Sequence, residues 1–192
     1  MLDNDTPFAL AVVGAAGSGK STIALQIAER SGAMYLDKDA LAGPLVNALL
    51  TAQGESAEER ESNTFYRDHV MPAEYAAIFA VASDNLRLGH SVVIDAPFAA
   101  YLDQPEFFSN AAQAAHWPNA SRSVLHVFAS EAETRRRLRD RGFPRDQAKL
   151  RDWNGFWPTW GHLTVRWTGV QVLKVDNDST ADIDGVLAHL NA

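Results

Sequence analysis

Apolar residues in this chain gather in short runs, separated by longer stretches in which apolar positions recur every three or four residues. The first run, residues 8–13, is apolar throughout, which is typical of a central parallel strand with both faces covered. Four later runs also have the length of strands: 33–36, 91–98, 124–128 and 170–175. The periodic stretches predict helices at 20–31, 40–53, 63–88 with a break near Pro72, 105–117, 130–141 and 180–190. Strands that alternate with helices predict an α/β fold, with a parallel sheet between two layers of helices.

A glycine-rich segment follows the first strand. It reads Gly14-Ala15-Ala16-Gly17-Ser18-Gly19-Lys20-Ser21, which is the G-x-x-x-x-G-K-S pattern of a phosphate-binding P-loop. A predicted strand precedes the segment and a predicted helix follows it, which is the context that the motif requires. We therefore predict a nucleotide site at this loop, in which all of these residues take part.

The residue types of the loop explain how it binds phosphate. Glycine lets the backbone approach phosphate oxygens closely, and successive N–H groups then point inward at the start of a helix. In this pattern Lys20 reaches the β- and γ-phosphates, and the Ser21 hydroxyl binds Mg²⁺. Thr22 either contacts the α-phosphate or caps the helix. The loop thus predicts ATP and Mg²⁺ as the cofactors.

Carboxylates follow the second and third strands. Asp37 and Asp39 flank Lys38 at the end of the second strand, and ligands of an open parallel sheet bind at this edge. We expect at least one of the two aspartates to act in catalysis or with Mg²⁺; the alternative is that they only cap the next helix. Asp95 ends the third strand in a Walker-B arrangement, which predicts a contact to Mg²⁺, directly or through water. The alternative for Asp95 is a turn residue before Pro97.

Arginines concentrate on the helix after the fourth strand. Arg137 and Arg141 are four residues apart and share a helix face. Arg145 follows where the next helix would begin. We predict that these three form a mobile lid that stabilises charge on the transferred phosphoryl group and excludes water. The alternative is a solvated helix face.

Two further segments bear on the substrate. Residues from about 40 to 90 form a helical insertion between the second and third strands, which is well placed to bind the phosphate acceptor. Within it, Arg67 or His69 could bind an acidic or hydroxylated substrate, the alternative being a surface or packing role. The second segment, residues 152–168, contains four tryptophans whose spacing predicts a helical face packed on the core, with base stacking as the alternative.

Composition narrows the class of protein. A length of 192 residues fits one domain, which we predict over residues 1–192. The net charge of −7 disfavours a nucleic-acid partner, because such proteins usually carry a basic footprint. The absence of cysteine excludes disulfides and thiolate metal sites. No signal peptide and no apolar run of ~18 residues are found, so we expect a cytoplasmic monomer or homodimer with no membrane partner.

With these motifs, the chain resembles small P-loop kinases, the group of shikimate kinase, gluconate kinase, chloramphenicol phosphotransferase and zeta toxin. It is most similar to bacterial "AAA family ATPase" proteins of the zeta-like kinase type, over residues 8 to about 155, and shares with them the segments 36–39, 93–98 and 141–150. The resemblance implies a three-layer αβα P-loop NTPase with the strand order 2-3-1-4-5. It also implies that Asp37 assists Mg²⁺ and that Asp39 faces the acceptor hydroxyl. The arginines and glycine motif that bind shikimate in that family are not evident in this sequence.

We therefore predict a kinase that transfers the γ-phosphate of ATP to a hydroxyl group of a small molecule, such as a metabolite or an antibiotic. Lys20, the two aspartates and the lid arginines would carry the reaction, with the acceptor region at about 40–90 and the lid at about 137–160. One alternative is a polynucleotide, tRNA-end or nucleotide-sugar kinase of the zeta-toxin type. Another is a nucleotide-binding regulator without an acceptor, which would need neither the aspartate pair nor an arginine lid.

Overall fold

A five-stranded parallel sheet forms the centre of the molecule. The structure, a computed structural model, describes residues 6–56, 63–143 and 146–190. The strands are β1 (Phe8–Val13), β2 (Met34–Asp37), β3 (Val92–Asp95), β4 (Ser121–Phe128) and β5 (Gln171–Asp176). They lie in the order β2-β3-β1-β4-β5, which confirms the expected fold class and strand order.

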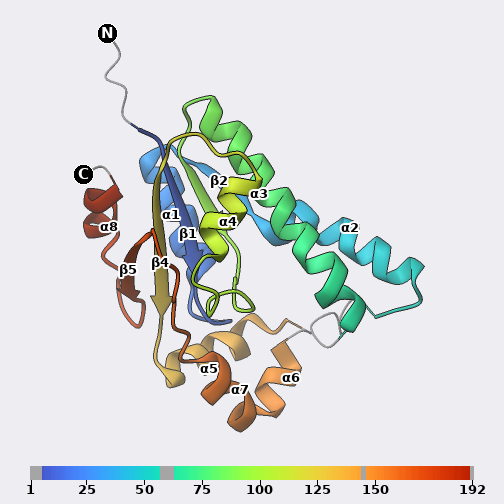
Figure 1. Ribbon diagram of the computed structural model, residues 1–192. Helices are drawn as coiled ribbons and strands as arrows, with labels where there is room; N and C mark the ends of the chain where they lie inside the picture. The colour runs from blue at the N-terminus through green and yellow to red at the C-terminus, as the bar shows by residue number, and fades with distance from the viewer. Residues whose placement is uncertain (1–5, 57–62, 144–145, 191–192) are drawn as a thin grey trace.

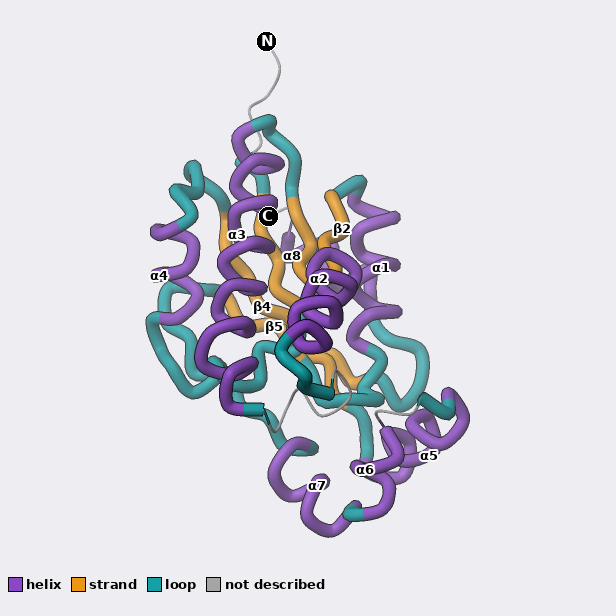
Figure 2. Tube along the Cα trace, turned by 90° about the vertical axis from the view of Figure 1, so that its right-hand side faces the viewer, coloured by secondary structure: helices purple, strands orange, loops and turns teal. Residues whose placement is uncertain are grey.

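Helices cover both faces of this sheet (Figure 1). On one face pack α1 (Lys20–Ser31) and α8 (Ile183–Leu190), and on the other α3 (Met71–Arg87) and α4 (Phe107–Ala114). The other helices lie beyond or beside the strand ends in Figures 1 and 2: α2 (Lys38–Ala52), the π-helical turn η2 (Tyr66–Val70), α5 (Glu131–Arg141), α6 (Gln147–Arg151) and α7 (Trp153–Trp160). Among the described residues, no helix is both long enough and apolar enough to cross a membrane.

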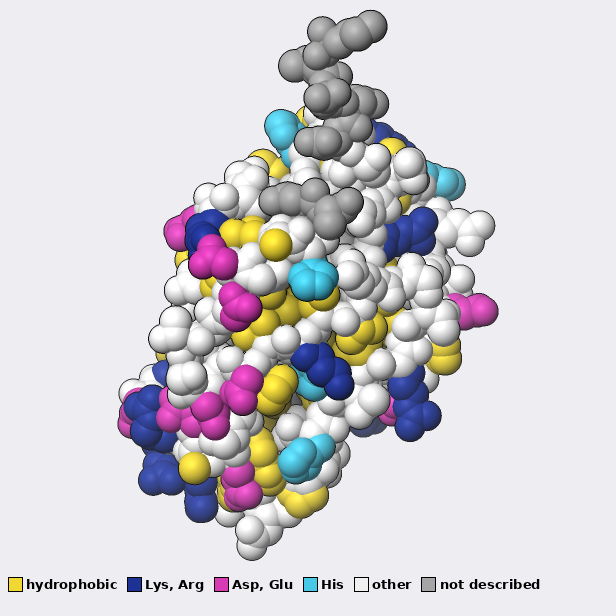
Figure 3. Space-filling model, turned by 90° about the vertical axis from the view of Figure 1, so that its left-hand side faces the viewer, with side chains coloured by type: hydrophobic (Ala, Val, Ile, Leu, Met, Phe, Trp, Pro, Cys, Tyr) yellow, Lys and Arg dark blue, Asp and Glu magenta, His cyan; other side chains and the backbone are white. Residues whose placement is uncertain are grey.

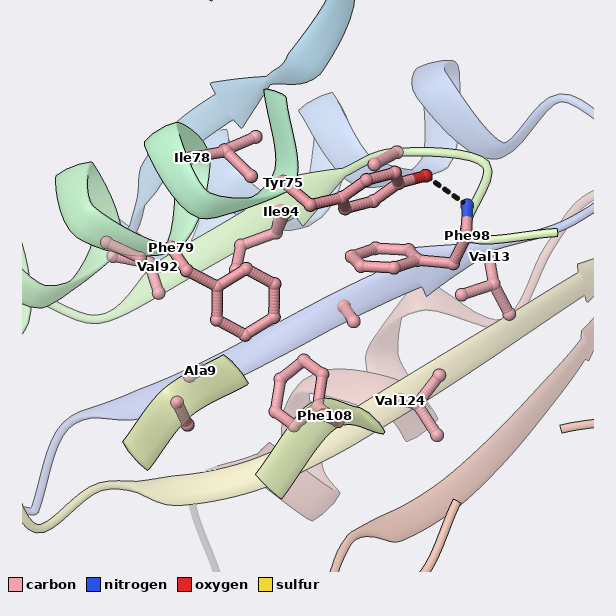
Figure 4. Packing of buried hydrophobic residues seen from close by; sticks show 14 of the residues in the cluster. Ala9, Val13, Tyr75, Ile78, Phe79, Val92, Ile94, Phe98, Phe108 and Val124 are labelled. Atoms are coloured by element: carbon pink, nitrogen blue, oxygen red, sulfur yellow. Dashed lines mark hydrogen bonds between the residues drawn. The ribbon is translucent and has the colours of Figure 1, made fainter. Parts of the chain in front are cut away.

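Small side chains on the sheet make room for aromatic rings from the helices. Ala9 of β1 is fully buried, and so are the rings of Phe98 and Phe108. Phe79 of α3 is 1% exposed, and its ring centroid lies 5.3 Å from that of Phe108 and 5.1 Å from that of Trp117. Figure 4 shows the rings of Phe79, Phe98 and Phe108 packed above the strands; Phe98 comes from the loop after β3 and the other two from helices. The aromatic layer fixes the distance between α3 and the sheet, and so the position of the loop that follows β3.

Several boundaries differ from the expectations by a few residues, such as the end of β3 at Asp95 rather than at residue 98, and two of the departures have a clear cause. β4 begins at Ser121 rather than at residue 124, because its polar first residues continue the ladder opposite Phe8 and its neighbours in β1. Pro72 does not break the segment at 63–88, since helical backbone continues through Met71. The five-residue turn of η2 precedes it, and the wider π-helical hydrogen bonding accommodates a proline that lacks an N–H group.

The aromatic layer yields a stability prediction. Phe79→Ala should lower the free energy of unfolding by about 3–5 kcal/mol, because it removes a buried ring and leaves a cavity. The matched control is Leu88→Ala at the end of the same helix, where the side chain is 74% exposed and the change should stay within about 0.5 kcal/mol. Urea denaturation measures both variants. Equal losses in the two would contradict this view of the core.

A half-buried histidine in β4 predicts a pH dependence of stability. Burial, and secondarily the nearby Lys174, lower the pKa of His126 below its usual value of 6.5. The unfolded chain therefore binds this proton at a higher pH than the folded protein does. The contribution of the neutral His126 side chain to the free energy of unfolding is complete above pH 6.5. It is lost as the pH falls from there through the lower pKa of the folded state. His126→Gln should therefore reduce the loss of unfolding free energy that urea denaturation measures between about pH 7.5 and about pH 5.

Candidate active site

The glycine-rich loop joins β1 to α1 at the carboxyl edge of the sheet. It is tightly turned: the Ser18 N–H donates to the Ala15 carbonyl at 3.1 Å, and Gly17 and Gly19 have φ values of 85° and 87°. A Cβ atom at Gly14 would collide with the Val127 carbonyl oxygen. The loop therefore needs glycine both for its backbone conformation and for its close approach to neighbouring chain.

Side chains from two later elements hold this loop in place. The Ser18 carbonyl accepts hydrogen bonds from Arg137 Nη1 at 3.1 Å and from Asn177 Nδ2 at 2.8 Å. Arg137 also donates to the Asn177 carbonyl at 2.5 Å and to Glu133 at 2.7 Å. Arg137 thus joins α5 and the end of β5 to the loop. No sequence pattern indicates this role of Asn177, which only follows the fifth apolar run.

A buried carboxylate faces the loop lysine. Asp95, at the end of β3, is 4% exposed, and its Oδ1 lies 3.8 Å from Lys20 Nζ. Its Oδ2 accepts a hydrogen bond from the Tyr35 hydroxyl at 2.9 Å. Burial and the neighbouring Asp95 carboxylate raise the pKa of Tyr35, so the phenol stays a donor. Oδ1 of Asp95 has no hydrogen-bond partner among the described residues.

The two aspartates after β2 take different positions. Asp37 lies opposite Asp95 in the strand register, and its Oδ1 accepts hydrogen bonds from the N–H groups of Asp39 at 2.8 Å and Ala40 at 3.2 Å. The capping alternative is therefore realised by Asp37. The Asp39 side chain is 39% exposed, and its Oδ1 lies 3.5 Å from Lys38 Nζ. Asp39 thus presents a partly exposed carboxylate at the edge of the sheet where the phosphate loop ends.

The glycine loop and the carboxylates after β2 and β3 suit the binding of Mg²⁺ and a nucleoside triphosphate. Mg²⁺ prefers oxygen ligands and commonly takes one or two carboxylates together with substrate phosphates. The buried Asp95 Oδ1 without a hydrogen-bond partner, beside the Lys20 ammonium, is an oxygen of this kind. The part of the chain that the structure describes holds no cluster of three or more metal-binding His, Asp or Glu side chains. The donor set therefore fits a metal shared with phosphate, with the Ser21 hydroxyl, Asp37 and Asp95 as the residues that could hold it.

The arginine-rich helix α5 is balanced by acids. Arg136 contacts Glu133 at 2.6 Å and Asp140 at 2.7 Å. The hydrogen bonds that Glu133 accepts from Arg136 and Arg137 lower the pKa of Glu133 to about 2. Figure 3 views the molecule from the left-hand side of Figure 1, and it shows basic and acidic side chains beside one another at the lower left. Ser130 caps the helix by accepting from the Glu133 N–H at 3.3 Å. The Glu133 carboxylate binds arginine instead of the Ser130 N–H, so only half of a capping box forms.

An open cavity of about 450 Å³ lies between α5 and the glycine loop, lined by Gly17, Gly19, Thr22, Arg136, Arg137, Asp140 and Arg141. Arg141 also binds Asp146, which is 1% exposed, through two hydrogen bonds of 2.6 and 2.9 Å. The structure thus brings Arg137 and Arg141 to one cavity beside the loop. Arg145 lies outside the described residues.

The tryptophan-rich segment divides between two clusters. Trp153 and Phe156 of α7 pack against Leu138 of α5 and against Ala16 of the glycine loop. Trp167 belongs to the main core beneath α4, whereas Trp160 is 42% exposed. The expected single face on the core is therefore wrong. The helices α5 to α7 instead have an apolar cluster of their own that reaches the phosphate loop.

The acceptor region contains contacts that the sequence did not reveal. Arg67 and His69 are exposed on η2, and no described contact joins either of them to Asp39. Their proposed role in substrate binding stays a prediction. A buried network lies nearby instead: Lys38 Nζ donates to Glu74 Oε1 at 2.9 Å, and the Tyr66 hydroxyl donates to Glu74 Oε2 at 2.6 Å. The only sequence signal for it was an acidic residue on the apolar face of a helix.

Most of the chain matches the sequence model of a known protein family. A sequence model of a family described as "AAA domain" matches residues 10–156. The chain belongs to this AAA domain family. The match includes the glycine loop, the carboxylates after β2 and β3, and the arginine helix α5.

Several individual proteins are similar to parts or all of the chain. A tRNA dimethylallyltransferase from Mesorhizobium japonicum is 34% identical over 80 residues, which are 42% of this chain and 25% of that enzyme, so the chain spans only a part of it. The structure of a sugar kinase from Janibacter sp. has a TM-score of 0.61 at 17% identity and covers 95% of this chain and 91% of its own. A gluconokinase from Sinorhizobium meliloti has a TM-score of 0.54 at 19% identity, with coverages of 96% and 90%. At such identities the likeness shows a shared fold.

The close packing at Gly19 predicts a binding defect. A Cβ there would collide with Asn177 Nδ2 and would require a non-glycine residue at a φ of 87°. Gly19→Ala should therefore weaken binding of a fluorescent ATP analogue by about 10-fold or more.

Gly32→Ala is the matched control, since Gly32 ends the same helix at a φ of 72° with nothing within 4 Å of an added Cβ. It should lower stability by about 1 kcal/mol through backbone strain, and leave nucleotide affinity unchanged. Unchanged affinity in Gly19→Ala would show that the loop does not bind phosphate in this conformation.

Proposed function

We propose that this protein is an ATP-dependent phosphotransferase that moves the γ-phosphate of ATP to a hydroxyl group of a small molecule. The observation that carries the proposal is the position of Asp39. Its partly exposed carboxylate follows the same strand end as Asp37, which lies opposite Asp95 on the neighbouring strand, and Asp95 is the partner of Lys20. A site that only binds and senses a nucleotide needs the loop and Asp95, but has no use for a further carboxylate beside them.

The donor side of the reaction rests on the glycine loop. Its backbone N–H groups and Lys20 would hold the β- and γ-phosphates, and Ser21, Asp37 and Asp95 would hold Mg²⁺. Bound Mg²⁺ supplies positive charge to the phosphate oxygens. The position of the Lys20 ammonium group, 3.8 Å from the Asp95 carboxylate at the end of β3, supports this role.

The acceptor side rests on Asp39. As general base it would take the proton of the acceptor hydroxyl, while the hydroxyl oxygen bonds to the γ-phosphorus and the bond from that phosphorus to the β–γ bridging oxygen breaks. ADP then leaves with the bridging oxygen. Arg141, with Arg145, would stabilise the charge on the transferred group. Arg137, which holds the Ser18 carbonyl, would act on the same group from the side of the loop.

The nature of the acceptor follows from the family group that the sequence resembles. The candidate acceptors are sugars, sugar acids, shikimate-like acids and hydroxylated antibiotics. A nucleotide sugar as the acceptor would place the protein with the zeta toxins. A polynucleotide acceptor is disfavoured by the net charge of −7 and by the pairing of the α5 arginines with acids.

Turnover against a panel tests this proposal. Purified protein with Mg·ATP is incubated with polyols, sugars, sugar acids, shikimate, aminoglycosides and chloramphenicol, and both ADP and the phosphorylated product are measured. For the acceptor that supports turnover, Asp39→Asn should lower kcat by about 100-fold or more, the usual range for a lost general base, and leave the KM for ATP unchanged.

Asp84→Asn is the control for loss of a carboxylate, since this side chain is 79% exposed on α3 and away from the loop. It should keep the wild-type kcat. If no acceptor supports turnover and Asp39→Asn binds nucleotide as the wild type does, the protein is a nucleotide-binding regulator and not a kinase.

A further inference from the structure

A buried ionic network lies directly behind the proposed base. Lys38 and Glu74 are each 3% exposed, although charged side chains are seldom buried so deeply. The ammonium group of Lys38 lies 2.9 Å from Glu74 Oε1 and 3.5 Å from Asp39 Oδ1, so one buried cation contacts both carboxylates. The network therefore joins the first turn of α2, which contains Asp39, to helix α3.

The π-helical turn completes this network. Tyr66 and Glu74 are eight residues apart, a separation that turns two side chains of an α-helix away from each other by about 80°. A π-helical turn contains one residue more than an α-helical turn. The eight-residue separation then behaves like the i, i+7 relation, in which both residues lie on one face. This explains how the Tyr66 hydroxyl reaches Glu74 Oε2 at 2.6 Å.

Stability alone does not account for the network. A buried ion pair is often no more stabilising than apolar residues of similar volume, and such residues surround it in the cluster that joins α2, η2 and α3. π-Helical turns are also frequent at functional sites. What the network does provide is a fixed place for Lys38, and hence for the carboxylate of the next residue.

We propose that Glu74, Lys38 and Tyr66 are positioning residues that hold the Asp39 carboxylate in the orientation needed for phosphoryl transfer. Asp37, Lys38 and Asp39 then have three separate tasks: Asp37 caps α2, Lys38 anchors its first turn to α3, and Asp39 faces the acceptor. This inference rests on the proposed kinase function. It extends that function to residues that touch neither ATP nor the acceptor.

Two mild substitutions test the network. Glu74→Gln keeps the shape of the side chain and removes its charge, and Tyr66→Phe removes one hydroxyl group. Each is assayed with Mg·ATP and the best acceptor of the panel, and with Mg·ATP alone, where water is the nucleophile. Glu74→Gln should lower the kcat measured with the acceptor by about 10- to 100-fold, because the base is misplaced. Tyr66→Phe should lower the same kcat by a smaller factor. The KM for ATP and the stoichiometry of ATP-analogue binding should not change.

Tyr75→Phe is the matched control. Tyr75 and Tyr66 are equally buried, at 5% exposure, and the Tyr75 hydroxyl accepts from the Phe98 N–H at 2.9 Å (Figure 4). The Lys38 ammonium lies 5.7 Å from the centre of the Tyr75 ring, and phenylalanine keeps that ring, so the variant removes only the hydroxyl bonded to Phe98. This variant should keep the wild-type kcat. Wild-type kcat in folded Glu74→Gln would overturn the inference, and so would parallel losses of kcat and ATP binding in all three variants, since these indicate a structural role. A wild-type protein without turnover in either assay would instead refute the kinase function itself.

Discussion

The pairing of Lys20 with the buried carboxylate of Asp95 is the interaction on which the rest of the site depends. A carboxylate at 4% exposure is costly to bury unless a positive charge or hydrogen-bond donors offset its desolvation. The Lys20 ammonium and the Tyr35 hydroxyl offset this cost for Asp95. Tyr35 binds Oδ2, and Oδ1 faces Lys20 of the phosphate loop without a hydrogen-bond partner among the described residues. The sheet order makes this possible, because β3 lies between β1, which leads into the loop, and β2, which ends in Asp37.

A second constraint joins the arginine helix to the phosphate site. Arg137 and Asn177 both hold the Ser18 carbonyl, and apolar residues of α5 and α7 pack against Ala16. Any displacement of α5 would therefore be transmitted to the loop that binds phosphate. In Figures 1 and 2 the helices α5 to α7 lie beyond the carboxyl end of β4, where a lid over the nucleotide would have to be.

Sequence patterns predicted the elements better than they predicted the contacts. Apolar runs located all five strands, and the glycine pattern located the tight turn between β1 and α1, because both signals are local. The strand order came from the family resemblance and not from the sequence pattern. Pro72 indicated a break, but the extra residue of a π-helical turn is not visible in helical periodicity. The ion pair of Lys38 with Glu74 joins two elements 36 residues apart, so local patterns could not reveal it. The two bonds of Arg137 to the loop and to Asn177 depend on tertiary structure in the same way.

The central proposal is that the loop holds a phosphoryl donor, with an acceptor hydroxyl next to Asp39. A crystal structure with Mg²⁺ and a non-hydrolysable ATP analogue tests this most directly. We expect the γ-phosphate beside Lys20, a metal ion near Ser21 and the Asp95 carboxylate, and space for a hydroxylated ligand between the γ-phosphate and Asp39. A γ-phosphate enclosed by protein, with Asp39 turned away and no room beside it, would contradict phosphoryl transfer to a hydroxyl at this site.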